Sequence, residues 1–503
     1  IQIAGAISIA SNQSMARVNT VEKLVVASQT TQNAHSIDID SDGFLSSIRT
    51  IDLSADTHES TTGNVDLTGV TVATTITGAK TNTLIGGTGA DVITGGAGAD
   101  TITGGAGVDK LVGGNGANKF VYLSNAADAT GAGETITGGT GTDTLVVAGG
   151  TTAVDFSDDT LDSLETLELT KDSAGSADNN VQSLTMSDAQ IDAFTIINAA
   201  GGDKITLSDV MTVDMLDNTV INTALKLVLK DVASNTLTLV NATMDDTGDE
   251  LTVDGSGLGS ANDLTFTGTA ENEAELVVTG GAGDDIIIGG GGDDTLVGGN
   301  GANVLTGNGG ADKITGGSGI DNITGGSGVD TLDGAAGEDI FIYAASSDFV
   351  TGTAVVDTVT GGAGDADTIQ IAGAISIASN QSMARVGTVE KLAVKSQDTE
   401  GKTHSIDIDS DASLSTIRTI DLSADSHEST TGNVDLTGVD QAVKVVGAKT
   451  NTLIGGSAID TLTGGAGVDK ITGAGGADVL DGGAGADIFI YAQMDHFISS
   501  NAV

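Results

Sequence analysis

The sequence predicts an all-β chain built as a tandem β-solenoid, and three observations predict it. A nine-residue pattern with glycines at fixed positions recurs in three blocks of the 503-residue chain. The stretches between the blocks are short alternating runs of β-branched and aliphatic residues separated by Ser, Asp, Asn and Gly. Long segments also return almost unchanged, which is typical of repeat architectures. We therefore expect parallel β-roll blocks that alternate with irregular β-helix-like stretches.

The long repeats divide the chain into modules. Residues 1–28 return at 369–396, and Tyr122 and Tyr491 close the two copies at the same offset, while Tyr343 closes a longer module between them. The predicted domains are module A at 1–122 (β stretch 1–85, roll 86–122), module B at 123–343 (β stretch 123–279, roll 280–343), a second copy of module A at 344–491 (β stretch 344–454, roll 455–491), and the start of a further module at 492–503. We expect the chain to be a slice of a longer tandem array.

Each block consists of nonapeptide units with an acidic or amide residue at the sixth position. Four units start at Gly86, seven at Gly280 and four at Gly455, and a single unit lies at 138–146. The sixth-position residues, which are the candidate metal ligands, are Asp91, Asp100, Asp109, Asn118, Asp143, Asp285, Asp294, Asn303, Asp312, Asp321, Asp330, Asp339, Asp460, Asp469, Asp478 and Asp487.

The spacing has a physical explanation. Tight turns with positive φ and close backbone approach favour glycine, and the middle residue of the three-residue run that follows, such as "TIT" or "KLV", points inward as in a strand. Two turns and two strands close a coil of 18 residues, so sixth-position residues 18 apart stack at about 4.8 Å. The central block then has two columns: Asp285, Asn303, Asp321 and Asp339 on one edge, and Asp294, Asp312 and Asp330 on the other.

Such columns require a cation. Stacked carboxylates at this distance repel by about 1–3 kcal/mol per pair. Carboxylates and free backbone carbonyls suit Ca²⁺ better than Zn²⁺ or copper. Asn118 and Asn303 keep a ligand oxygen but lose the charge, so their sites should be weaker. That Gly and Asp only form turns remains open for the unit around Asp143 and for "GGAGDADT" at 361–368, which contains an insertion.

The nonapeptide G-G-x-G-x-D-x-U-x resembles the repeats-in-toxin (RTX) calcium-binding family. The resemblance covers 16 units. The stretches between the blocks resemble, more loosely, the irregular β-solenoid regions of bacterial surface-layer proteins of the RTX type. The resemblance implies calcium-binding β-rolls, export by a type I system of Gram-negative bacteria, and folding by calcium outside the cell. The expected localisation is therefore secreted, extracellular or at the bacterial cell surface.

Composition disfavours several other classes. With 69 acidic and 19 basic residues the net charge is −50, which repels nucleic acid and anionic membranes and attracts cations. The absence of Cys removes disulfides, thiolate metal sites and cysteine nucleophiles. No apolar stretch approaches the ~20 residues of a membrane helix, so no membrane insertion is expected. Neither HExxH nor GxSxG occurs, and we expect no enzyme activity.

Three smaller features carry separate expectations. The histidines are expected to be solvated loop residues, with a transition-metal site as the alternative; they are His35, His58, His404, His427 and His496. Ninth-position threonines could form an outward ice-binding ladder, although the strand preference of Thr explains them equally; they include Thr94, Thr103, Thr306, Thr315 and Thr324. Only residues 187–194 predict a short helix, with Ser187 as the N-cap.

The predicted function is that of a calcium-dependent extracellular structural protein that self-assembles into a bacterial surface layer, coat or matrix filament. Its main partners would be copies of itself and calcium ions, and cell-surface polysaccharide is a candidate anchor. The alternatives are an extender or spacer region of a giant RTX adhesin and, third, the calcium-binding tail of a secreted toxin or enzyme. The long β stretches offer lateral surface, which favours assembly.

Overall fold

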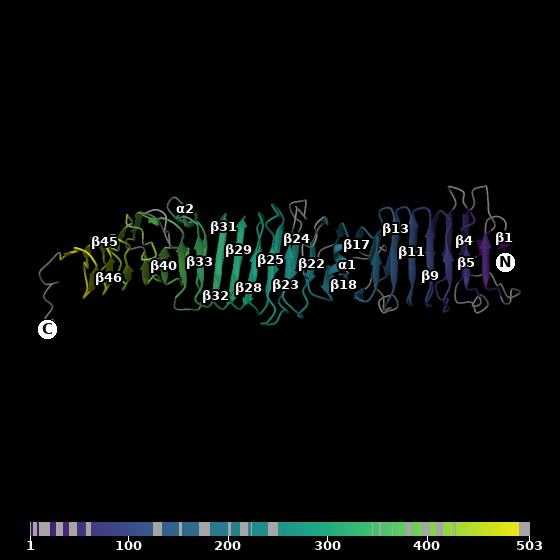
Figure 1. Cartoon of the computed structure of the whole chain (residues 1–503), viewed down its shortest axis with the longest axis horizontal. Helices are drawn as coiled ribbons and strands as arrows, with labels where there is room; N and C mark the ends of the chain where they lie inside the picture. The colour runs from purple at the N-terminus through teal and green to yellow at the C-terminus, as the bar shows by residue number, and fades with distance from the viewer. Residues whose placement is uncertain are drawn as a thin grey trace. The chain divides into compact units, whose positions relative to one another are not determined.

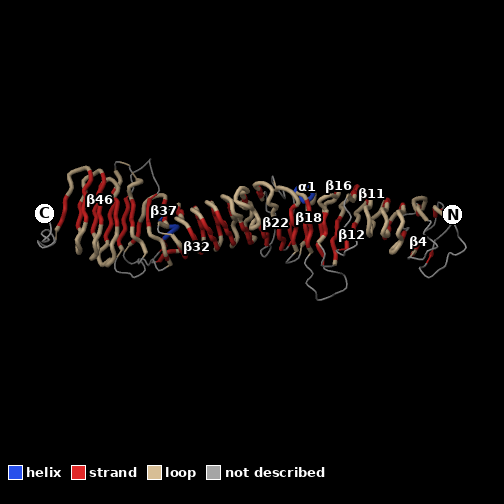
Figure 2. The backbone as a smooth tube through the Cα atoms, turned by 90° about the horizontal axis from the view of Figure 1, so that it is seen from below, coloured by secondary structure: helices blue, strands red, loops and turns tan. Residues whose placement is uncertain are grey.

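The computed structural model contains two compact units, Ile1–Val232 with Leu237–Asp254, and Ala233–Thr236 with Gly255–Val503. It describes residues 2–3, 8–9, 21–26, 34–39, 48–56, 62–123, 133–149, 153–170, 182–199, 203–211, 220–222, 224–239, 250–344, 346–351, 354–364, 366–378, 385–394, 403–408, 416–425, 427 and 429–491. Within each unit, strands of successive turns pair in parallel, as a ladder (Figures 1 and 2). The predicted all-β solenoid is confirmed.

The first unit contains three sheets. One sheet consists of β1 (Gln2–Ile3), β3 (Lys23–Val26), β5 (Thr50–Asp52), β7 (Thr75–Thr77), β9 (Val92–Gly96), β11 (Lys110–Asn115), β13 (Thr135–Thr140) and β16 (Thr160–Asp162). The second consists of β2 (Ser8–Ile9), β4 (Ala34–Asp38), β6 (Thr62–Asp66), β8 (Thr81–Ile85), β10 (Thr101–Thr103), β12 (Lys119–Leu123), β14 (Thr144–Ala148), β17 (Thr166–Thr170), β19 (Ile196–Asn198) and β21 (Val220–Asn222). The third contains β15 (Val154–Asp155), β18 (Ser183–Met186), β20 (Lys204–Leu207), β22 (Ala224–Val228) and β24 (Glu250–Asp254).

The second unit is built in the same way. One sheet contains β26 (Glu275–Thr279), β28 (Thr295–Asn300), β30 (Lys313–Ser318), β32 (Thr331–Ala336), β36 (Thr358–Thr360) and β39 (Val386–Gly387). The next contains β25 (Leu264–Thr267), β27 (Ile286–Ile288), β29 (Val304–Gly309), β31 (Asn322–Ser327), β33 (Ile340–Tyr343), β37 (Thr368–Ile371), β40 (Lys391–Val394), β42 (Thr419–Asp421), β44 (Lys444–Val446), β46 (Thr461–Gly465) and β48 (Val479–Gly483). The last contains β38 (Ser376–Ile377), β41 (Thr403–Asp407), β43 (Thr431–Asp435), β45 (Thr450–Ile454), β47 (Lys470–Thr472) and β49 (Ile488–Ile490).

Three further elements complete the description of the strands. β34 (Val350–Thr351) and β35 (Ala354–Val355) form an antiparallel pair, and β23 (Asn235–Thr238) lies at the division between the two units. Pairing also continues across the predicted module boundaries, since Tyr122 pairs with Val147 and Tyr343 with Ile371. Strand pairing therefore does not separate the predicted modules, and their boundaries stay a prediction that rests on the sequence repeats.

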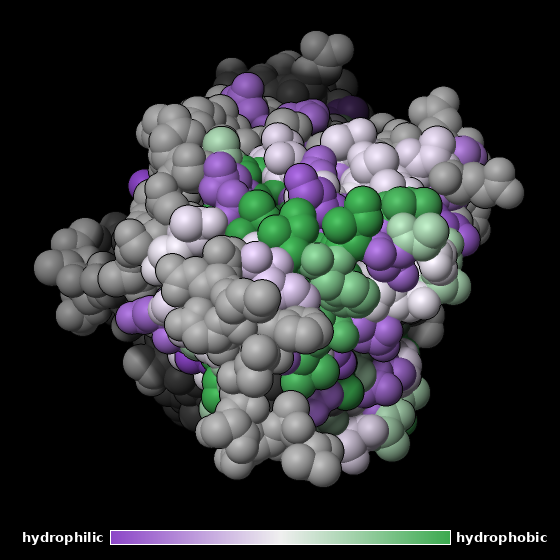
Figure 3. Space-filling view, turned by 90° about the vertical axis from the view of Figure 1, so that its left-hand side faces the viewer, coloured by the Kyte–Doolittle hydropathy of each residue, from purple (hydrophilic) through white to green (hydrophobic). Residues whose placement is uncertain are grey.

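The core is a ladder of the inward aliphatic residues that the nonapeptide predicts. Ile93, Ile102, Leu111 and Phe120 are fully buried, and each contributes about 1.5–3 kcal/mol through burial. Figure 3 shows apolar side chains on the end of the second unit that carries β49. Phe489 is 40 % exposed there, whereas its counterpart Phe341 is 0 % exposed, because β37 pairs with β33 and no described strand follows β49.

Two short helices interrupt the strands. The predicted helix is confirmed as α1 (Asp188–Asp192), whose N-cap Ser187 forms a capping box with Gln190. The expectation of only one helix was wrong, because α2 (Ser346–Phe349) follows the central roll. Phe349 is buried against Tyr343, with ring centroids 5.0 Å apart, so packing and not local propensity holds this single turn.

The strands of the central roll are longer than the predicted three residues. β28 and β30 each span six residues and extend over the first three positions of the next unit, where Gly299 pairs with Gly317. From the third unit of the central roll onward, the second position has a positive φ, for example 104° at Gly299 and 123° at Gly317. Non-glycine residues at three second positions of the rolls also have a positive φ, which side chains disfavour; they are Asn308, Ala335 and Ala474.

We expect Ala335→Gly to stabilise the protein. Ala335 has a φ of 69°, and glycine would relieve this strain at a smaller entropic cost, for a net gain of about 0.5–1 kcal/mol. Thermal unfolding in calcium checks this gain. The neighbouring Ala336→Gly is the control, because Ala336 has no positive φ and should lose about 0.5–1 kcal/mol. Equal effects of the two substitutions would contradict the prediction.

Candidate calcium sites

The structure places the sixth-position residues in the two predicted columns of the central roll. Each Oδ1 atom accepts the backbone N–H of the column member one turn earlier, for example Asp312 from Asp294 at 2.8 Å and Asp330 from Asp312 at 2.9 Å. On the other edge, Asn303 accepts from Asp285 at 2.9 Å and Asp321 from Asn303 at 2.8 Å. Asp339 accepts from Asp321 at 2.9 Å.

The flanking rolls have the same ladder. Asp109 accepts from the Asp91 N–H at 2.7 Å, and Asn118 from Asp100 at 3.1 Å. Asp143 accepts from Asn118 at 2.8 Å, so the unit that looked isolated in the sequence continues a column. In the last roll, Asp478 accepts from Asp460 at 2.9 Å and Asp487 from Asp469 at 3.1 Å. Asp478 and Asp487 are half-buried, whereas the other sixth-position residues are buried.

The second carboxylate oxygen distinguishes the start of a column from its interior. The first members use Oδ2 to accept a backbone N–H four residues earlier, at 2.7 Å in each case; they are Asp91, Asp285, Asp294 and Asp460. Later members have a buried Oδ2 with no hydrogen-bond partner among the described residues; they include Asp100, Asp143, Asp312, Asp321, Asp330, Asp339 and Asp469. A buried carboxylate without a donor is costly, so these oxygens fit a cation.

Beside these oxygens is a space that no side chain fills, because the first residue of the unit is glycine. A Cβ atom on Gly316 would meet the Asp321 carboxylate of its own unit and, at 2.8 Å, the carbonyl oxygen of Gly334 in the next turn. Gly307 has the same relation to Asp312 and to the Gly325 carbonyl. The first glycine of the unit thus leaves room where a carboxylate and a carbonyl oxygen converge. Oxygen donors of these two kinds are the ligands that Ca²⁺ prefers.

The columns raise the pKa values of their carboxyls. Burial is the largest cause, and neighbouring carboxylates add to it at Asp294, Asp312, Asp330 and Asp339. The pKa of Asp312 and that of Asp339 rise to about 7, and those of Asp100, Asp294 and Asp330 to about 6. Burial in the columns therefore disfavours the charged form of these carboxyls.

Side chains alone do not form a metal cluster. In the part of the chain that the structure describes, no three His, Asp or Glu side chains are grouped to hold a metal ion, and the sequence has no Cys. The geometry explains this finding, because each turn contributes one carboxylate per edge. Backbone carbonyls would have to supply the remaining ligands of a bound ion.

Sequence reasoning missed column members that lack the glycines. Asp357 accepts the Asp330 N–H at 2.9 Å in this way, whereas Asp367, which lies in the segment 361–368 left open above, accepts the Asp339 N–H at 2.8 Å. Asn82, Glu134 and Asn451 are further buried members of this kind. The signal that could have found them is the second half of the nonapeptide, an Asp, Glu or Asn followed by Thr and an aliphatic residue. Segments such as "DTVT", "ETIT" and "NTLI" carry it without the preceding turn.

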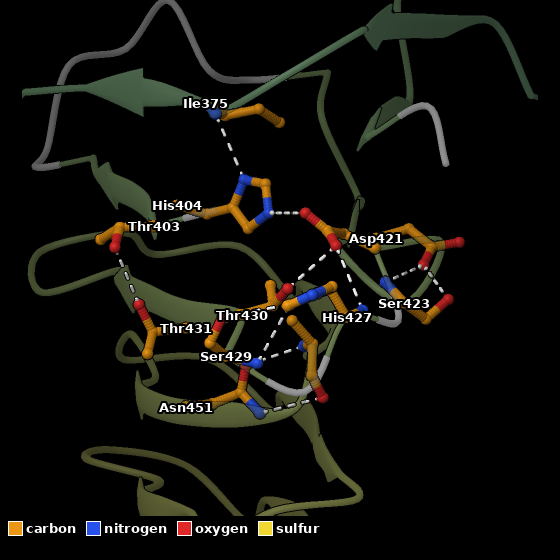
Figure 4. Close-up of polar contacts among 12 residues, drawn as sticks. Ile375, Thr403, His404, Asp421, Ser423, His427, Ser429, Thr430, Thr431 and Asn451 are labelled. Atoms are coloured by element: carbon orange, nitrogen blue, oxygen red, sulfur yellow. Dashed lines mark hydrogen bonds and ion pairs between the residues drawn. The ribbon is translucent and has the colours of Figure 1, made fainter. Parts of the chain in front are cut away.

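The expectation of solvated histidines was wrong at two positions. His35 and His404 occupy equivalent places in the two copies and are buried, with Nε2 3.1 Å from Asp56 Oδ2 and 3.4 Å from Asp425 Oδ2. His404 Nδ1 accepts the Ile375 N–H at 3.2 Å (Figure 4), which places its proton on Nε2. Burial lowers the pKa of His404. His427 is bonded to Ser429, and His58 and His496 lie outside the described residues.

The ninth-position threonines do not form one ladder. Thr306 and Thr324 pair on neighbouring strands β29 and β31. Thr315 lies in a different sheet, between Val297 and Asp333. Thr94 and Thr103 also belong to two sheets. No regular surface for ice results from these positions.

Fold and site together define a parallel β-roll with stacked, buried carboxylates. Four segments match the family model described as RTX calcium-binding nonapeptide repeat, at residues 76–120, 277–305, 306–341 and 454–489. These matches support the RTX assignment and the presence of calcium-binding repeats. A comparison with curated proteins found no match. Within the described ranges, no helix has the length and apolar character needed to cross a membrane.

Proposed function

We propose that this chain is a calcium-dependent extracellular structural protein whose rolls fold when Ca²⁺ binds and which then assembles into a bacterial surface layer, coat or matrix filament. The row of buried Oδ2 atoms without hydrogen-bond donors supports the first part. A divalent ion between successive turns would neutralise these oxygens and link the turns. The similarity to RTX repeats, which are typically found in secreted proteins, supports the extracellular location.

Charge supports a second role for calcium in assembly. A chain with a net charge of −50 repels its copies over about 8–10 Å at physiological salt. Roughly nine ions within the three rolls would neutralise only about 18 charges. Exposed carboxylates such as Glu273, Asp284 and Glu338 would then bind further ions between neighbouring molecules.

We expect calcium to act in two stages, folding at lower concentration and ordered polymers at higher concentration. Circular dichroism follows the first stage, and light scattering with electron microscopy follows the second. High monovalent salt is the control, because it screens charge but cannot bridge carboxylates, and it should not replace calcium in the second stage.

The alternative function is an extender region of a giant RTX adhesin. The near-identity of residues 1–28 and 369–396 favours it, since a spacer needs only repeated, self-supporting modules. A folded chain that stays monomeric at millimolar calcium and high protein concentration would favour the extender function over self-assembly.

A further inference from the structure

Six neighbouring strands of the second unit carry no charged residue. β25, β27, β29, β31, β33 and β37 follow one another in one sheet, and none of them contains Asp, Glu, Lys, Arg or His. Figure 1 shows β29, β31 and β33 side by side. We call the outer surface of these six strands the neutral face. In a chain with 69 acidic residues, a surface of this length without charge requires an explanation.

The outward side chains of the neutral face form rows across the strands. One row runs through Ile286, Val304 and Asn322, which are paired positions of successive strands. Ile286 is 41 % exposed and Val304 39 % exposed. A second row pairs Thr306 with Thr324. Rows of small side chains repeat at about 4.8 Å, and such a surface can pack against another sheet at about 10 Å.

Charged residues border the neutral face. Lys391 lies in β40, the next strand of the sheet, and forms an ion pair with Asp421 at 3.0 Å. Asp284 and Glu338 are exposed in the series of turns at one edge, and Ile320, which is 52 % exposed, lies between them in that series. An uncharged centre with a charged rim is the usual arrangement of a protein interface.

The opposite sheet of the central roll has the same repeat but carries charge. Glu275 in β26 and Lys313 in β30 are exposed, and Asp333 in β32 is half-buried. The nonapeptide therefore accommodates charged residues at its outward strand positions. The absence of charge from the neutral face is a property of that face and does not follow from the repeat.

We propose that two copies of this chain pack against each other, sheet against sheet, through the neutral face. A net charge of −50 keeps two copies apart wherever their charged surfaces meet, whereas two neutral faces meet without bringing like charges together. A contact with two-fold symmetry uses the same patch on both copies, so it needs no second binding surface. Asp284 and Glu338 would lie at its rim. The inference deepens the assembly proposed above and rests on it.

Sedimentation velocity of the full, calcium-folded chain tests the contact. Val304→Lys places an ammonium group in the neutral face and should raise the protein concentration at half-association about tenfold or more, because the charge would be buried without a partner. The matched control is Thr358→Lys, an exposed strand position of β36 in the opposite sheet, which should associate as the parent chain does. Val304→Thr keeps the face uncharged and should also associate.

Monovalent salt separates this contact from bridges made by calcium. At a calcium concentration that folds the chain without polymerising it, added sodium chloride screens the charges around the neutral face and should strengthen the pairing. Pairing that weakens as sodium chloride is added would overturn the inference. Circular dichroism verifies that each variant is folded under the conditions of the measurement.

The remaining outcomes distinguish this inference from the proposed function. If Val304→Lys associates as readily as the parent chain, the neutral face is not the contact, while assembly through other surfaces survives. A parent chain that stays monomeric at millimolar calcium and high protein concentration overturns the contact and the assembly together. A monomeric parent that is retained on a neutral polysaccharide, with retention lost in Val304→Lys, would assign the face to a glycan and overturn the pairing.

Discussion

Chelation of calcium at about pH 8 is expected to unfold the rolls, and acidification of the metal-free chain toward pH 4 is expected to restore β structure. Carboxyls such as Asp312, Asp339 and Asp100 have pKa values raised from 3.8 to between about 6 and 7 by burial. Folding therefore favours their protonated form. The stability that protonation contributes is complete below 3.8 and is lost as the pH rises through about 6 to 7.

Calcium reverses this dependence on pH. The ion binds the deprotonated carboxylate, so its affinity rises with pH over the range in which the metal-free fold weakens. A tenfold excess over the dissociation constant adds about 1.4 kcal/mol per site. Roughly nine sites then exceed 10 kcal/mol, which is comparable to the whole stability of a typical domain.

Unfolding temperatures followed by circular dichroism between about pH 4 and pH 8, with calcium and with a chelator, measure both effects. The two curves should converge at low pH and diverge at high pH. Magnesium at the same concentration is the control for ionic strength, because Mg²⁺ dehydrates reluctantly and demands octahedral geometry. A metal-free chain whose unfolding temperature rises between pH 5 and pH 8 would contradict the prediction.

Gly307→Ala should lower stability in calcium far more than Gly309→Ala in the same nonapeptide unit. A Cβ on Gly307 would collide with the Asp312 carboxylate and lie 2.5 Å from the carbonyl oxygen of Gly325. It would thus occupy the space in which we expect the ion, and overpacking alone costs about 1–3 kcal/mol. We expect Gly307→Ala to lose one calcium ion as well.

Gly309 provides the matched control. A Cβ there would have only ordinary contacts, the nearest with Ser327 Oγ at 3.4 Å, and Gly309 has no positive φ. Gly309→Ala should be neutral or stabilise by about 0.4–1 kcal/mol, because it restricts the unfolded chain. Calcium titration followed by thermal unfolding of both variants provides the measurement. Similar losses in the two variants would show that glycine at the first position serves the backbone and not an ion.

The sequence by itself determined the solenoid, the 18-residue coil and the two columns of the central roll. Local rules suffice there, since every unit repeats the same turn, the same inward aliphatic residue and the same sixth position. Asp312 could therefore be placed under Asp330 from spacing alone, and residues 187–194 could be read as a helix from the Ser187 cap. The strand runs between the rolls were also predictable from their alternation.

Only the tertiary structure decided where the columns end and which oxygens lack a donor. Asp367 reaches its column across 28 residues, because pairing of β33 with β37 sets the register and the intervening turn adapts its length. Spacing cannot reveal that Tyr343 closes Asp357 while Asp367 Oδ2 stays unpartnered. The burial of His35 and His404 was equally unpredictable, since each depends on an aspartate 21 residues further along the chain. Such contacts arise from stacking between turns, and a pattern within one turn does not contain them.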